Sequence, residues 1–152
     1  RLLKKVRLDV MQRHDAGQLR EAKATLEAVL KAGESAPVLN NLANLQWQLK
    51  DPAAQQTAER AFKLAPGDAL ILDTLGWILV QKSQLDAGLR HLREARLRDP
   101  ANPEIRYHLA WALAKSGRKG EALQELEAAL QSGRSFPGID GARALRAELG
   151  TS

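Results

Sequence analysis

Cysteine is absent from this chain of 152 residues. Its absence excludes disulfide bonds, thiolate catalysis and cysteine-ligated zinc sites. It does not indicate a compartment, because a reduced cytosol and an oxidising periplasm both tolerate a protein without cysteine.

Long apolar runs are also missing. Runs such as Ala69 to Leu72 and Trp77 to Val80 are far shorter than the roughly 20 residues that a membrane-spanning helix needs. We therefore expect no membrane insertion by this fragment. The chain begins with Arg1 rather than Met, without an apolar signal core or a small-residue cleavage site. We expect it to be a fragment of a longer protein, from which targeting information can have been removed.

Motifs of catalysis are lacking as well. The sequence has no phosphate-binding glycine loop and no nucleophile elbow. His14, His91 and His108 are far apart, do not pair at helical spacing and have no carboxylate cluster expected around them. Asp73 and His108 could meet across adjacent helices, but they have no nucleophile beside them. We therefore expect no enzyme activity, no cofactor and no metal site.

Small residues recur along the chain at a spacing close to 34 residues. The three columns are Val10, Ala43, Gly76 and Ala110; Ala22, Ala54, Gly88 and Ala122; and Val29, Ala61, Ala95 and Ala129. Such a period is typical of stacked helical repeats. Antiparallel helices approach closely only where their crossing points carry Gly or Ala. The columns therefore predict an all-α protein whose helix pairs cross at these residues.

Gly and Pro divide the helical periodicity into pairs of segments. The predicted pairs are 1–15 with 18–32, 36–49 with 52–65, 68–81 with 85–98, and 102–116 with 119–131. They form one domain over residues 1–152, with repeats at about 1–34, 35–66, 67–100 and 101–134. A capping helix is expected over about 139–149, with Asp140 accepting from its first-turn amides.

The repeat has a specific residue frame. The third repeat reads Leu72-x2-Leu75-Gly76-x2-Leu79, Gly88-x3-Leu92, Ala95 and Pro100, and the fourth reads Leu109-Ala110-x2-Leu113, Ala122-x3-Leu126 and Ala129. This frame resembles the tetratricopeptide repeat, W-x2-L-G-x2-Y, A-x3-F, P. The resemblance implies a right-handed α-solenoid of about four repeats.

In that family the first helix of each pair lines a concave groove for an extended peptide or a partner helix. Carried over by position, the groove residues are Asn40, Asn41, Asn44, Trp47, Asp73, Trp77, Gln81, Tyr107, His108, Trp111 and Lys115, with Lys4, Arg7 and Met11 from the first repeat. The resemblance thus implies a protein or peptide partner. The tryptophans have a second interpretation, since their rings can simply pack against a neighbouring repeat.

The net charge of +5 is concentrated between Gly88 and Gly120. Four arginines of this stretch share a predicted helix with an apolar stripe, so we interpret them as a solvated outer face; they are Arg90, Arg93, Arg96 and Arg98. Aromatic residues do not interleave with them, as single-strand binders require. We therefore expect no nucleic-acid partner.

Four short segments of the sequence resemble one bacterial subfamily of these repeats. The segments are Leu39 to Ala43, Leu72 to Trp77, Glu104 to Ala110 and Ser135 to Gly138. They look like the C-terminal repeats of tetratricopeptide lipoproteins in exosortase (PEP-CTERM) exopolysaccharide systems. That resemblance implies a noncatalytic scaffold in a periplasmic or envelope location. The alternatives are a cytosolic adaptor or chaperone-like module, and the recognition arm of a larger enzyme. The apolar edge formed by Leu2, Leu3, Val6 and Val10 also predicts possible self-association.

Overall fold

The computed structural model describes residues 16–150, which form eight α-helices and no strand. The helices are α2 (Ala16–Leu30), α3 (Ala36–Gln48), α4 (Ala54–Leu64), α5 (Ala69–Gln81), α6 (Leu85–Arg98), α7 (Pro103–Lys115), α8 (Lys119–Gln131) and α9 (Ile139–Gly150). The predicted all-α fold is confirmed. The first helix expected, over residues 1–15, and the apolar edge expected to self-associate lie outside the described residues.

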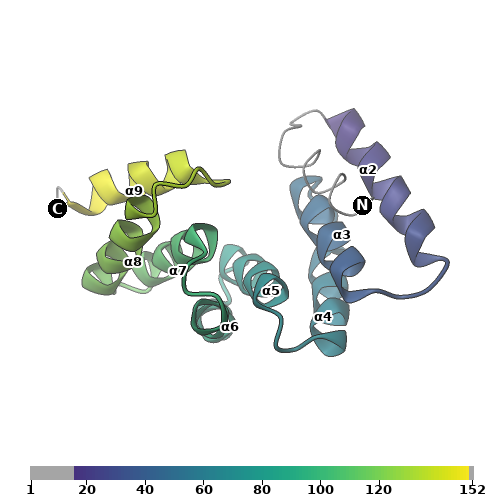
Figure 1. Cartoon of the computed structure of the whole chain (residues 1–152), viewed down its shortest axis with the longest axis horizontal. Coiled ribbons are helices and arrows are strands. Elements are labelled where there is room, and N and C mark those ends of the chain that lie inside the picture. The colour runs from purple at the N-terminus through teal and green to yellow at the C-terminus, as the bar shows by residue number, and fades with distance from the viewer. Residues whose placement is uncertain (1–15, 151–152) are drawn as a thin grey trace.

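The helices are arranged as successive antiparallel pairs. The contacts are most extensive within the pairs α3 and α4, α5 and α6, and α7 and α8. Contacts of α3 with α5 and of α5 with α7 place the first helices of these pairs side by side. Figure 1 shows the resulting curved array, which runs from α2 in purple to α9 in yellow. None of the described helices combines the length and apolar character that a bilayer span requires.

Polar side chains cap the N-termini of α3, α5 and α7, the first helices of the last three pairs. The Ser35 side chain accepts from the amide of Val38, Asp68 caps α5 and Asn102 caps α7. Asp68 Oδ1 accepts from Leu70 N at 2.9 Å. Each cap satisfies amides that have no carbonyl partner within the helix, so it determines where the helix begins.

The turns inside the pairs share one geometry. Lys50, Ser83 and Gly117 each follow a first helix in the left-handed region, with φ of 58°, 65° and 79°. The next amide donates to a carbonyl five residues back, as in Asp51 N to Gln46 O at 2.8 Å. This is the arrangement of a Schellman motif, which ends a helix and reverses the chain.

The helices α5 and α6 approach each other closely at Gly76 and Gly88. A Cβ atom added to Gly88 would lie 2.3 Å from Val80 Cγ1 and 2.9 Å from Gly76 O. Ala110 and Ala122, from the same two columns, are completely buried. The columns of small residues therefore mark the crossings at which the paired helices touch.

The helix α9 covers the last pair by packing against α8 and α7. Ala142 is completely buried there, and Leu145 and Leu149 pack at its edge. The expected cap by Asp140 is wrong. The left-handed turn at Gly138, with φ of 91°, starts the helix at Ile139, and Asp140 falls within its first turn. The Asp140 side chain is 96% exposed and pairs with Arg143.

Candidate partner-binding surface

The predicted groove residues of the last three repeats lie on three neighbouring helices, α3, α5 and α7. We call them the first-helix surface, made up of Asn40, Asn41, Asn44, Trp47, Asp73, Trp77, Gln81, Tyr107, His108, Trp111 and Lys115. Lys4, Arg7 and Met11 lie outside the described residues. The structure brings most of this set together in an aromatic cluster, a charged cluster and an amide group.

Trp77 is the centre of the aromatic cluster. Its ring stacks on His108 with centroids 4.1 Å apart and an interplanar angle of 18°. It meets Trp111 edge to face at 5.3 Å, and Tyr107 lies 6.1 Å away. The Nζ atom of Lys115 lies 5.1 Å from the Trp111 ring centroid. Trp77 comes from α5 and the other rings from α7, so the cluster joins two repeats.

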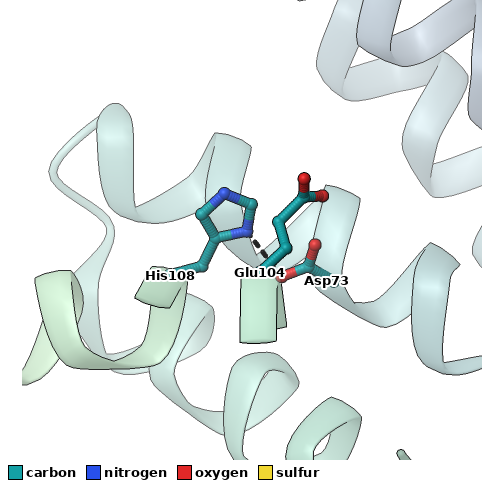
Figure 2. Close-up of side chains that lie close together, drawn as sticks. All are labelled: Asp73, Glu104 and His108. Atoms are coloured by element: carbon teal, nitrogen blue, oxygen red, sulfur yellow. Dashed lines mark hydrogen bonds and ion pairs between the residues drawn. The ribbon is translucent and has the colours of Figure 1, made fainter. Parts of the chain in front are cut away.

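Beside the aromatic rings lies a charged cluster of Asp73, Glu104 and His108 (Figure 2). Asp73 Oδ1 is 2.7 Å from His108 Nδ1, and Asp73 is only 4% exposed. Burial lowers the pKa of His108, but the charge and hydrogen bond of Asp73, with the charge of Glu104, outweigh burial and raise that pKa above 6.5. The expectation that no carboxylates surround the histidines is therefore wrong at His108. Glu104 was missed, although it precedes His108 by four residues and so shares its helix face.

The amide group connects α3 to α5. Asn44 Nδ2 donates to Thr74 Oγ1 at 3.2 Å and to Asn40 O at 3.2 Å. Asn40 is 6% exposed, and its Oδ1 atom has no hydrogen-bond partner in the described part of the chain. Asn41 is half-buried. The surface on α3 therefore presents amides rather than rings.

Three predicted groove residues have surroundings of their own. Trp47 packs against the core cluster that contains Ala43 and Leu75. Tyr107 is approached by α9 so closely that a Cβ atom on Gly141 would lie 2.5 Å from its Oη atom, and burial raises the Tyr107 pKa. Gln81 is exposed at the end of α5. Trp77 and Trp111 are likewise only partly buried, and they contact each other across α5 and α7.

Several arginines of the basic stretch have acidic partners. Arg93 pairs with Glu121 at 3.2 Å, and Arg106 pairs with Glu125 at 2.8 Å. Arg96 also pairs with Glu125 at 3.4 Å. These ion pairs connect α6 and α7 to α8 and neutralise part of the positive charge.

A second feature is an open depression of about 460 Å³ between α2, α3 and α4. Its lining includes Gln46, Thr57 and Arg60. Gln46 Oε1 is buried and has no hydrogen-bond partner within residues 16–150. The depression is made largely by second helices, so it is an alternative place for a partner.

The ion pair between His108 and Asp73 predicts a pH-dependent stability. We expect His108→Gln to cost more stability at about pH 6 than at about pH 9. Because the pKa of His108 is raised in the folded state, protonated His108 stabilises the fold below 6.5, and this contribution is lost as the pH rises through the folded-state pKa. Denaturant unfolding of both proteins at both pH values measures the difference.

His91 provides a control with the opposite sign. Burial and the positive charge of Arg90 lower the pKa of His91. His91→Gln should therefore cost less stability at about pH 6 than at about pH 9, because protonation of His91 favours the unfolded chain. A cost of His108→Gln that is independent of pH would show that the ion pair does not stabilise the fold.

The sequence comparison agrees with this architecture. Residues 74–138 match the family model of the tetratricopeptide repeat, and they span the paired helices from α5 to α8. Residues 74–138 belong to the tetratricopeptide-repeat family. Among curated proteins, none matches it in sequence.

Several solved structures share the fold of this chain. YrrB, described as a TPR protein with an unusual peptide-binding site, has 24% identity and a TM-score of 0.63 over 76% of this chain and 61% of its own. MamA has 19% identity and a TM-score of 0.67 over 89% and 84%. The Yersinia enterocolitica type III secretion chaperone SycD, in complex with a peptide of the translocator YopD, has 20% identity and a TM-score of 0.61 over 73% and 86%. This chain thus spans less than two thirds of YrrB.

Proposed function

We propose that this chain is a noncatalytic scaffold that binds a polypeptide along its first-helix surface. The observation that carries the proposal is the continuity of that surface across α3, α5 and α7. Along it, Asn44 of α3 bonds to Thr74 of α5, and Trp77 of α5 contacts Trp111 of α7. Tryptophan is enriched among the few residues that contribute most of the energy at protein interfaces.

The composition of the surface suits an extended chain. Amide side chains such as Asn41 can hydrogen-bond a peptide backbone in either direction, because they both donate and accept. Trp111 offers a large apolar face for a partner side chain. The peptide-binding descriptions of YrrB and SycD support this use of the fold.

We propose further that the scaffold belongs to a bacterial envelope or exopolysaccharide assembly or export system, with a periplasmic or envelope location. The support is the resemblance of Leu72 to Trp77 and of Glu104 to Ala110 to the lipoproteins of exosortase systems. Cell fractionation of the full-length protein tests the location. Recovery of the protein in the cytosol would favour an adaptor or chaperone-like role instead.

Peptide selection followed by mapping tests the binding site. A library of linear peptides is selected on the immobilised chain, and a selected peptide is titrated into ¹⁵N-labelled protein. We expect the largest amide shift changes on α3, α5 and α7. Changes confined to the depression around Gln46, Thr57 and Arg60 would contradict the proposal, and so would a selection that yields no binding peptide.

A further inference from the structure

The charged cluster of Asp73, Glu104 and His108 has a donor set suited to a metal ion. The three side chains offer one nitrogen and two carboxylate oxygens, and these ligand atoms all lie within 4.8 Å of one another. Figure 2 shows the side chains converging from two helices. Glu104 and His108 are four residues apart on α7, so they project from one face of it, and Asp73 faces them from α5.

The charges of the cluster favour a divalent cation. Two carboxylates and one imidazole carry a net charge of −1 even when the imidazole is protonated. Asp73 is buried, and neither Glu104 nor His108 is fully exposed, so water screens this excess poorly. A divalent cation bound to two carboxylates and a neutral imidazole leaves the group with no net charge.

The spacing of the ligand atoms is also compatible with a bound zinc ion. Ligands at about 2.1 Å from a tetrahedral zinc ion lie roughly 3.4 Å from one another. The separation of 2.7 Å between Asp73 Oδ1 and His108 Nδ1 is below that value, and the limit of 4.8 Å for all three ligand atoms is above it. Small side-chain rotations, chiefly of the long Glu104 side chain, therefore reach the required arrangement.

The chemistry of the donors selects the class of ion. Mixed imidazole and carboxylate ligands suit zinc and neighbouring first-row transition metals, whereas calcium and magnesium prefer oxygen ligands alone. Stacking of Trp77 on the His108 ring at 4.1 Å restrains the orientation of the imidazole. Three protein ligands also leave a coordination position for water or a partner group.

We infer that Asp73, Glu104 and His108 form a binding site for one divalent transition-metal ion of the zinc class on the first-helix surface. The inference does not depend on peptide binding, because the donors come entirely from this chain. The ion would bind next to Trp77 and would join α5 to α7.

Direct titration tests the site. The untagged chain, stripped of metal with a chelator, is titrated with Zn²⁺ by calorimetry and with Ni²⁺ by tryptophan fluorescence. We expect one Zn²⁺ per chain, and quenching by Ni²⁺ because Trp77 stacks directly on a ligand ring. His108→Gln and Asp73→Asn should each weaken binding at least about 10-fold.

Two kinds of variant keep the test decisive. Glu104→Gln changes a less buried ligand and should weaken binding if the other two variants fail to fold. His14→Gln and His91→Gln remove the other two imidazoles of the chain and should leave the affinity unchanged. The inference is overturned if Zn²⁺ does not bind, if folded Glu104→Gln binds it as tightly as the parent, or if binding is lost with His14 or His91.

Discussion

Gly88→Ala is expected to lower the free energy of unfolding by about 2 to 3 kcal/mol. The added Cβ atom would lie 2.3 Å from Val80 Cγ1, 2.9 Å from Gly76 O and 3.0 Å from Val80 N. Two of these atoms belong to the backbone of α5, so a side-chain rotation alone cannot relieve the overlap. The helices α5 and α6 must separate, which loosens packing along the whole pair.

A matched substitution distinguishes this effect from the general effect of adding a methyl group. Gly120 lies in α8, and a Cβ atom there would have no neighbour within 4 Å. Gly120→Ala should be neutral or stabilise the fold by no more than about 1 kcal/mol. Denaturant unfolding followed by circular dichroism compares both variants with the parent. Equal midpoints for the parent and Gly88→Ala would refute the close crossing of α5 and α6.

Replacement of Trp77 or Trp111 by Ala is expected to weaken partner binding by about 2 kcal/mol or more for each residue, roughly 30-fold. Each substitution removes a large apolar anchor from the centre of the first-helix surface. The two rings are in contact at 5.3 Å, so their effects should not simply add. Titration of a selected peptide, followed by calorimetry, measures the loss.

Folding must be measured in the same variants, because Trp77 also stacks on His108. Circular dichroism provides that measurement. Asn44→Ala is the matched polar control: it removes the hydrogen bond to Thr74 and should weaken binding less than either tryptophan change. A folded double tryptophan variant that binds the peptide as tightly as the parent would move the site to another surface, such as the depression beside Gln46.

The repeat architecture was predictable because its cause is local and periodic. A close helix crossing admits only small residues, so small residues that recur at this period indicate where helices cross. Gly76 and Gly88 indicate the crossing of α5 and α6 in this chain. Turn residues such as Gly117 mark the ends of helices in the same way. These signals can be recognised in a single sequence, without knowledge of the rotation between successive helix pairs.

The contacts of the candidate surface were less predictable because they depend on that twist. Position along the repeat places Asp73 and His108 on neighbouring helices, but only the packing of α5 against α7 brings their side chains to 2.7 Å. It also decides that Trp77 stacks on His108, so the ring participates in packing as well as lying on the surface. The approach of α9 to Tyr107 depends on a turn outside the repeat frame.

The contact between α9 and Tyr107 links the last described helix to the first-helix surface. Ala142 is the only fully buried residue of α9, whereas most of α5 is buried. Segments with few buried contacts open at the lowest free-energy cost in native-state exchange. When α9 detaches, Gly138 and Gly141 withdraw from the Tyr107 ring, which they approach closely in the closed form. Detachment of α9 would therefore add an aromatic face to the surface around Trp77, and under the proposed function it would enlarge the surface that a partner meets.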